Sequence, residues 1–246
     1  MCRHFVSVSS DEAAAVVRSL LLLQHAEEPA DTCGTGGADE PCRHDAAPGE
    51  EPREGAHVFP DAPAFLVVYA REQLSVAEMT WGYHVEWKRG PLFNTRLESA
   101  LQPTSMWHDS LLNRRCAIPV HAFYESHLTE TVRSTRTGKP AKRQYRFARI
   151  RQDADGDDVS RPLLVAGIYQ DDRFSVVTVE PDDTVAPIHN RMPLVLDEQA
   201  ALAWLNPAST VDDLIELARS SAVDLAAQAE DPAQPRQKPD DQLTLF

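Results

Sequence analysis

A cysteine directly follows the first methionine in the opening stretch MCRHF. A small residue at position 2 favours removal of Met1, which would leave Cys2 with a free α-amine and a free thiol on neighbouring carbons. The unperturbed pKa values are about 7.7–8.0 for the amine and about 8.5 for the thiol, so both nucleophiles are accessible near neutral pH. The alternative is an arbitrary residue on a frayed terminus. Phe5 and Val6 favour an anchored terminus, because they are apolar and adjacent.

Three further stretches carry polar residues that could act on such a nucleophile. They are FNTRLES (93–99), RRCAIPVHAFYES (114–126) and IHNRMPLVL (188–196). Taken singly, each polar residue also has a structural explanation. Asn94 could cap a turn, and Arg96 could pair with Glu98 on one strand face. Glu125 could be an exposed strand residue, and His189 could be a hydrogen-bonded histidine in a proline-bounded loop.

These stretches and the Met-Cys start, taken in order, resemble the SRAP family, the SOS response-associated peptidases. The family patterns are an N-terminal Met-Cys, an Asn-x-Arg-x-Glu, an Arg-Cys-x-x-Pro leading to Phe-Tyr-Glu, and a His-x-Arg-Met-Pro. WGY (81–83), AGIY (166–169) and VVTVEP (176–181) fall where the family has similar strands. The resemblance runs from Met1 to about Asn206. It implies a protein that recognises abasic sites in single-stranded DNA and joins itself to them through residue 2.

The chemistry of the residues agrees with that implication. An abasic sugar equilibrates with an open-chain aldehyde, which condenses with an amine to an imine, and an adjacent thiol can then close a thiazolidine ring. By resemblance, Asn94 positions the terminus or the sugar and Arg96 clamps a phosphate. Glu125 shuttles protons during sugar opening and imine formation, and His189 is a second acid or base that also assists reversal.

Further DNA contacts are expected from residues beside these motifs: Arg3, His4, Trp81, Arg114, Arg115 and Arg191. The family usually begins Met-Cys-Gly-Arg-Phe, so Arg3 and His4 depart from its pattern, and His4 would contact a phosphate only when protonated. WGYHVEW (81–87) lacks the family's proline. Trp81, Tyr83 and Trp87 are candidate base-stacking residues, with a core position as the alternative for Trp81.

The charge distribution is compatible with DNA binding despite a net charge of −14. Thirteen lysines and arginines but four acids lie between Lys88 and Arg151. Acidic residues concentrate between Glu27 and Glu54 and in the last forty residues, so a basic face can coexist with an acidic total. The alternative is an ordinary solvated surface.

The pattern of elements predicts an α+β fold: a mainly antiparallel, curved or barrel-like sheet with a few flanking helices. Ser9 and Glu12 form a capping-box signature for a helix reaching about His25. The expected strands are 64–70, 76–83, 116–125, 144–150, 163–169 and 174–179, and short helices are expected over 197–204 and 210–218. We predict a single domain over residues 2–222 with a flexible insertion at 26–55, followed by a disordered linker at 223–241.

The chain ends in QLTLF (242–246), which resembles the peptide that binds the bacterial sliding clamp. Gln242 would bind at the rim of an apolar cleft and Leu243, Leu245 and Phe246 inside it. The alternative is a strand that docks onto the protein's own core.

No cofactor and no metal is expected, because Cys33, Cys42 and His44 lack the spacing of a metal site. SLLLLQ (19–24) is too short to span a membrane. We therefore expect a cytoplasmic, nucleoid-associated bacterial monomer. Two rival functions stay open: a cysteine peptidase with an N-terminal nucleophile, and a non-catalytic single-stranded DNA adaptor recruited by the clamp.

Overall fold

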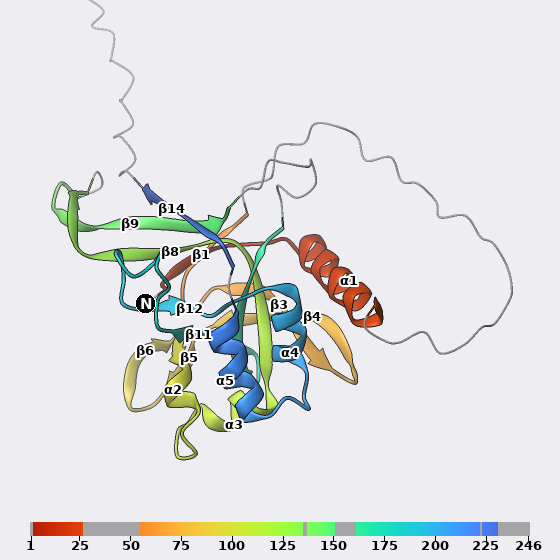
Figure 1. Ribbon diagram of the computed structural model, residues 1–246. Helices are drawn as coiled ribbons and strands as arrows, with labels where there is room; N and C mark the ends of the chain where they lie inside the picture. The colour runs from red at the N-terminus through yellow and green to blue at the C-terminus, as the bar shows by residue number, and fades with distance from the viewer. Residues whose placement is uncertain (1, 27–54, 135–136, 151–160, 222, 231–246) are drawn as a thin grey trace, which may run out of the picture.

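Strands dominate this computed structural model, which describes residues 2–26, 55–134, 137–150, 161–221 and 223–230 (Figure 1). The main sheet contains β1 (His4–Ser7), β2 (His57–Val58), β3 (Pro63–Ala70), β4 (Gln73–Trp81), β7 (Asn94–Arg96), β8 (Arg115–Arg133), β9 (Pro140–Arg149), β10 (Leu163–Gln170), β11 (Arg173–Val179), β12 (Met192–Pro193), β13 (Val195–Leu196) and β14 (Leu225–Glu230). A separate hairpin pairs β5 (Tyr83–Val85) with β6 (Lys88–Leu92). The helices are α1 (Ser10–Ala26), α2 (Leu97–Ala100), α3 (His108–Asn113), α4 (Glu198–Leu205) and α5 (Val211–Ser220).

The main sheet is strongly curved. Its pairings run from β8 through β3, β4, β11 and β10 and return to β8. All of its pairs are antiparallel except those of β11 with β4 and with β7. The predicted α+β fold with a mainly antiparallel, curved sheet is confirmed, and each of the six expected strands lies within an observed strand or overlaps one.

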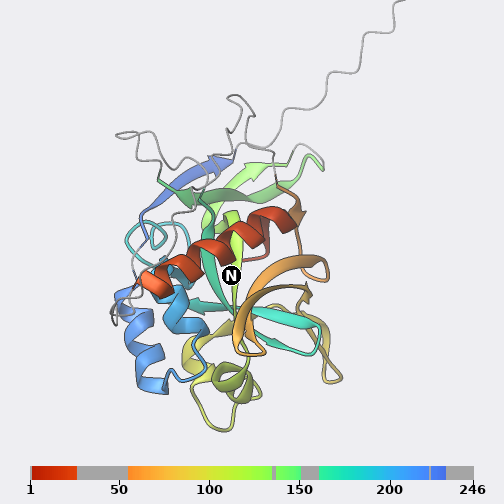
Figure 2. The ribbon, with the colours of Figure 1, turned by 90° about the vertical axis from the view of Figure 1, so that its right-hand side faces the viewer.

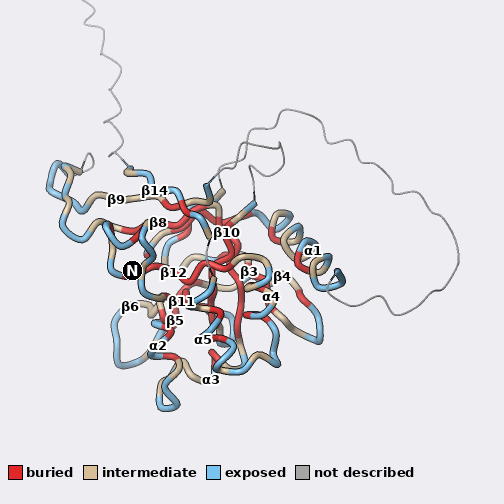
Figure 3. The backbone as a smooth tube through the Cα atoms, in the orientation of Figure 1, coloured by how far each residue is buried: buried red, intermediate tan, exposed pale blue. Residues whose placement is uncertain are grey.

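Strand β8 separates two hydrophobic cores, because successive side chains of a strand point to opposite faces. Cys116 and Ile118 point into the inner core, where they join Phe5 and Phe174. Ala117 points into the outer core beneath the helices. Figure 3 shows the buried stretches of β8, β10 and β11 meeting at the centre of the molecule.

All five helices contribute buried residues to the outer core, and α1 lies across the face of the sheet (Figure 2). Helix α1 begins at the predicted capping box: the Ser9 backbone N–H donates to Glu12 at 2.7 Å, and the Glu12 N–H donates back to Ser9 Oγ at 3.3 Å. Asp197 caps α4, and Thr210 caps α5 through a second capping box. Leu20 of α1 and Trp204 of α4 are fully buried here. The three predicted helices are therefore confirmed.

The predicted domain boundary at residue 222 is wrong, because Leu225–Glu230 forms β14 and pairs with β9 over its whole length. Only Leu225 of this strand is buried, so its sequence has no run of core residues to indicate a strand. The insertion expected at 26–55 falls almost entirely on residues 27–54, and the predicted clamp-binding peptide on 242–246, both outside the described residues. No helix in the described part of the chain is long and apolar enough to cross a membrane.

Candidate functional site

The pairing of β1 with β8 places Cys2 next to Glu125. His4 lies opposite Tyr124 and Phe5 opposite Phe123, so the chain before β1 runs alongside the residues that follow Tyr124. The Cys2 side chain is 1% exposed, and its thiol lies 3.5 Å from the carbonyl oxygen of His4. Burial, and then the negative charge of Glu125, raises the pKa of the Cys2 thiol to about 12. The thiol is therefore protonated at neutral pH.

Asn94 fixes the backbone of Cys2. It is the first residue of β7, which pairs in parallel with β11 through Val176. The Asn94 side-chain amide donates a 2.7 Å hydrogen bond to the carbonyl oxygen of Cys2. The hydrogen bond involves the backbone of Cys2 and not its thiol.

Glu125 is a buried carboxyl beside this cysteine. It is 2% exposed, and burial raises its pKa to about 7. Protonated and ionised forms are therefore both populated near neutral pH, which is the property that a proton shuttle requires.

His189 approaches Glu125 from the loop between β11 and β12. The loop is held to β8 by a 3.0 Å hydrogen bond from the Leu128 N–H to the Ile188 carbonyl. His189 Nδ1 lies 3.9 Å from Glu125 Oε2, a separation too long for a hydrogen bond. Burial lowers the pKa of His189, so the ring is neutral at pH 7. The structure thus brings Cys2, Asn94, Glu125 and His189 together, as predicted.

Arg191 supports the His189 loop through contacts within the protein. Its side chain is about 9% exposed, and its guanidinium forms two hydrogen bonds of 2.8 and 2.9 Å with the Glu98 carboxylate and one of 2.6 Å with the Thr178 carbonyl. All three of these contacts stay within the protein, and the DNA contact of Arg191 stays a prediction. Glu98 pairs with Arg191 and not, as the alternative held, with Arg96.

Arg115 is the first residue of β8, ten residues before Glu125, and Arg114 directly precedes the strand. Arg115 is 5% exposed and donates to the backbone carbonyls of four residues: Leu111, Leu112, Trp204 and Asn206. Arg114 contacts Asp109 and donates to the Tyr169 carbonyl at 3.2 Å. Neither residue joins the Cys2 site, and the prediction that Arg115 contacts DNA is wrong.

Trp81 belongs to the inner core. Its side chain is fully buried, and its indole N–H donates to the Phe93 carbonyl at 2.7 Å. The predicted stacking of a base on Trp81 is therefore wrong, and the core alternative is confirmed. Trp87, by contrast, is 72% exposed between β5 and β6.

His4 packs as an aromatic ring and not as a cation. It stacks against Tyr124 and Phe59, and burial together with the neighbouring His57 lowers its pKa to about 4. The protonated form that the predicted phosphate contact requires is therefore disfavoured at neutral pH. Arg3 and Arg96 are exposed cations near Cys2; the guanidinium carbon of Arg3 lies 5.9 Å from the ring centre of Phe93.

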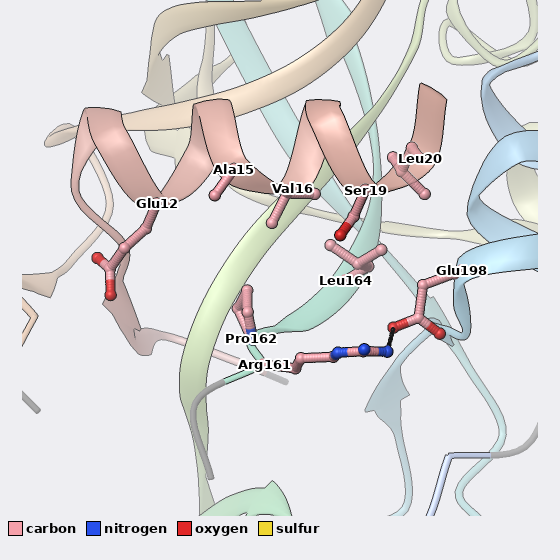
Figure 4. Close-up of a pocket in the computed structure, with 9 residues that line it drawn as sticks. All are labelled: Glu12, Ala15, Val16, Ser19, Leu20, Arg161, Pro162, Leu164 and Glu198. Carbon is pink, nitrogen blue, oxygen red and sulfur yellow. Dashed lines mark ion pairs between the residues drawn. The ribbon is translucent and has the colours of Figure 1, made fainter. Parts of the chain in front are cut away.

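A groove of about 190 Å³ lies beneath α1, away from Cys2 (Figure 4). Val16, Leu20 and Leu164 form its apolar wall, and at its edge Arg161 pairs with Glu198 at 3.9 Å. No predicted site residue lines it, so the groove is separate from the candidate site. Among the described residues no three histidine, cysteine or acidic side chains gather as metal ligands would.

A family model described as SOS response associated peptidase (SRAP) matches residues 1–229. The chain belongs to the SRAP family. The match includes every residue of the Cys2 site and ends one residue before β14 does.

Two curated relatives show low sequence identity to this chain. The chain is 22% identical over 167 residues to the abasic site processing protein YoqW of Bacillus subtilis, covering 65% of this chain and 70% of YoqW. It is 26% identical over 182 residues to the abasic site processing protein YedK of Escherichia coli, covering 70% of this chain and 74% of YedK.

Solved structures share the fold over nearly the whole chain. A phage-related protein of Bordetella bronchiseptica superposes with a TM-score of 0.59 at 18% identity, covering 93% of this chain and 94% of that one. A protein of Bacteroides thetaiotaomicron gives a TM-score of 0.57 at 15% identity, covering 95% and 97%.

Proposed function

We propose that this SRAP-family protein captures abasic sites in single-stranded DNA through a covalent bond to Cys2, after removal of Met1. The observation that carries the proposal is the convergence of Asn94, Glu125 and His189 on Cys2 from three distant segments. YoqW and YedK, which resemble this chain, are themselves named abasic site processing proteins.

The reaction joins the amine and the thiol of Cys2 to one carbon atom. The α-amine adds to the aldehyde carbon of the opened sugar, and the resulting hydroxyl leaves as water to give an imine. The sulfur then adds to the imine carbon while its proton passes to nitrogen, which closes the five-membered thiazolidine ring. One water is released overall, and no oxidant or reductant is needed.

The surroundings of Cys2 favour this order of steps. The buried thiol is protonated at neutral pH, so the amine is the first nucleophile. Glu125, with its pKa near 7, can protonate the departing hydroxyl and accept a proton from the incoming amine. Asn94 holds the Cys2 carbonyl, so both reacting groups keep one orientation.

His189 supplies a second acid or base on the far side of Glu125. Its neutral ring can accept the proton that Glu125 releases after a small approach across their 3.9 Å separation. The exposed cations Arg3 and Arg96 would hold the phosphates on either side of the sugar.

The test uses the purified full chain and a single-stranded oligonucleotide with one abasic site. A covalent complex should survive a denaturing gel, and its intact mass should equal the protein without Met1 plus the DNA minus one water. Cys2→Ala should abolish the complex, as should a variant that retains Met1, because the first lacks the thiol and the second lacks the Cys2 amine. An exposed control, Leu22→Ala, should react like the unchanged protein.

The two rival functions give different results in the same experiment. Turnover of a peptide that depends on Cys2, without a DNA complex, would support the peptidase. Salt-sensitive DNA binding without a covalent band would support the adaptor.

A further inference from the structure

Strand β8 carries a wide bulge where it pairs with β9. Ser126 pairs with Gln144 of β9, and the next pair along the two strands joins Thr131 to Lys142. Four residues of β8, 127–130, therefore lie where β9 has one, so β8 has three extra residues here. Bulges interrupt regular pairing and bend the strand, and they are over-represented next to active sites. We call residues 127–130 the β8 bulge.

Side chains hold the β8 bulge in a defined shape. His127 Nδ1 accepts hydrogen bonds from the backbone N–H groups of Thr129 at 3.2 Å and of Glu130 at 2.9 Å. The Glu130 carboxylate in turn accepts hydrogen bonds of 2.7 Å from the guanidinium of Arg143 and from the hydroxyl of Tyr145. Because its first and last residues are both bound, the bulge can present a backbone group at a fixed place.

The β8 bulge presents the backbone N–H of Leu128, which donates a 3.0 Å hydrogen bond to the carbonyl oxygen of Ile188. Ile188 directly precedes His189. In the described part of the chain, this is the only backbone hydrogen bond between β8 and the His189 loop, residues 180–191. The Leu128 side chain is 43% exposed, so the residue contacts the loop chiefly through its backbone.

The position of the His189 loop decides whether His189 can exchange a proton with Glu125, which is carried by β8 itself. His189 Nδ1 lies 3.9 Å from Glu125 Oε2, beyond the about 2.7–3.2 Å of a hydrogen bond. A misplacement of only about 1 Å can slow catalysis by about 100-fold.

We propose that the backbone N–H of Leu128 is a positioning group, delivered by the β8 bulge, that holds His189 within reach of Glu125. This inference rests on the proposed capture of abasic DNA. It adds to that function a residue outside the sequence motifs, which acts through its backbone and so could stand at this position with many side chains.

The test removes the backbone donor and leaves the loop in place. Proline has no N–H, so Leu128→Pro should slow formation of the covalent complex with an abasic oligonucleotide by about 10- to 100-fold. Leu128→Ala keeps the N–H and should react much faster than Leu128→Pro. A chain lacking residues 128–130 should be as slow as Leu128→Pro, and it should fold, because one residue of β8 then faces one residue of β9. Circular dichroism should confirm that all three variants fold.

A double variant shows whether Leu128 acts through His189. His189→Ala should itself slow the reaction by about 100-fold or more. Adding Leu128→Pro to His189→Ala should cause no further loss, because the group that Leu128 positions is already absent. A general disturbance of the fold by proline would instead slow the reaction equally in both backgrounds.

The pKa of His189 gives a second measurement that needs no DNA. Burial lowers this pKa in the unchanged protein. In Leu128→Pro the ring should be less buried, so its pKa should rise toward the ordinary value of histidine. NMR titration of the histidine ring protons would measure the change, with His189→Ala identifying the signal.

The inference is wrong if Leu128→Pro reacts as fast as the unchanged protein, or if its loss is the same with and without His189. It is also wrong if His189→Ala reacts at the full rate, or if Leu128→Pro leaves the pKa of His189 unchanged. In each of these cases the capture of abasic DNA still stands. If the unchanged protein forms no covalent complex, the proposed function itself fails, and the titration of His189 still tests whether Leu128 positions the ring.

Discussion

The Asn94 side chain donates a 2.7 Å hydrogen bond to the carbonyl oxygen of Cys2, although 92 positions separate them in the sequence. The parallel pairing of β7 with β11 brings Asn94 to this point, and the antiparallel pairing of β1 with β8 brings Cys2. The bond holds Cys2 through its backbone. Asn94 is thus a positioning residue, and Glu125 and His189 are the groups able to move protons.

Replacing Asn94 by alanine should slow formation of the covalent DNA complex by about 10- to 100-fold, because the Cys2 backbone loses its anchor. Asn94→Asp should be as slow, since a carboxylate cannot donate to a carbonyl oxygen. Initial rates on denaturing gels would measure the effect, with Asn113→Ala as the control at an exposed asparagine of α3. Unchanged rates in both Asn94 variants would contradict the assigned role.

The raised pKa of Glu125 predicts how stability depends on pH. Burial holds the carboxyl protonated up to about pH 7 in the folded state, whereas the unfolded chain releases the proton near 4.5. The folded state therefore binds more protons between these values, and the free energy of unfolding should fall as pH rises through this window, by at most about 3 kcal/mol.

Glu125→Gln should remove that fall, because glutamine cannot ionise. Urea unfolding at pH 5 and pH 8 would compare the two proteins. We expect similar stability at pH 5 and a more stable Glu125→Gln variant at pH 8. Parallel pH profiles for the two proteins would show that Glu125 does not titrate in this window. In the same variant the covalent complex should form more slowly at every pH, since the proton shuttle is lost.

Sequence motifs alone group Cys2, Asn94, Glu125 and His189, because each lies in a short pattern whose order matches the SRAP family. The strands can be predicted equally well, because the continuous apolar runs of segments such as β8 and β10 are visible in the sequence. Both predictions depend on local patterns that survive low overall identity.

Charge next to a motif is a weaker guide. Arg115 and Arg191 sit beside motif residues, yet they bind carbonyls and a carboxylate inside the protein. A sequence does not tell whether a guanidinium meets a phosphate or a helix end. The contact of His4 with Phe59 is equally hidden, because it arises from the register of β1 with β2, which no spacing in the sequence determines.

The pairing of β14 with β9 predicts different stabilities for two shortened chains. A chain ending at Glu230 should unfold with the same free energy as the full chain. A chain ending at Asp224 should lose at least about 2 kcal/mol, because it lacks the buried Leu225 and the partner of β9. Equal stability of the two shortened chains would contradict this role of β14.

The chain ending at Glu230 also tests the predicted peptide 242–246: an immobilised sliding clamp should retain the full chain and not the shortened one.

Replacing Arg115 by alanine should lower the stability of the protein, whereas replacing Arg96 by alanine should weaken DNA binding. Arg115 is buried and donates to four carbonyls, so Arg115→Ala should lower the free energy of unfolding by about 3 kcal/mol or more, because these acceptors lose their donor. Arg96 is exposed, so Arg96→Ala should change stability by less than about 0.5 kcal/mol. It should instead weaken binding of single-stranded DNA and reduce the slope of log affinity against log salt by about 1. Urea unfolding and fluorescence anisotropy at several salt concentrations would measure both quantities. An unchanged salt slope in Arg96→Ala would show that Arg96 does not contact a phosphate. A reduced slope in a folded Arg115→Ala would show that Arg115 does.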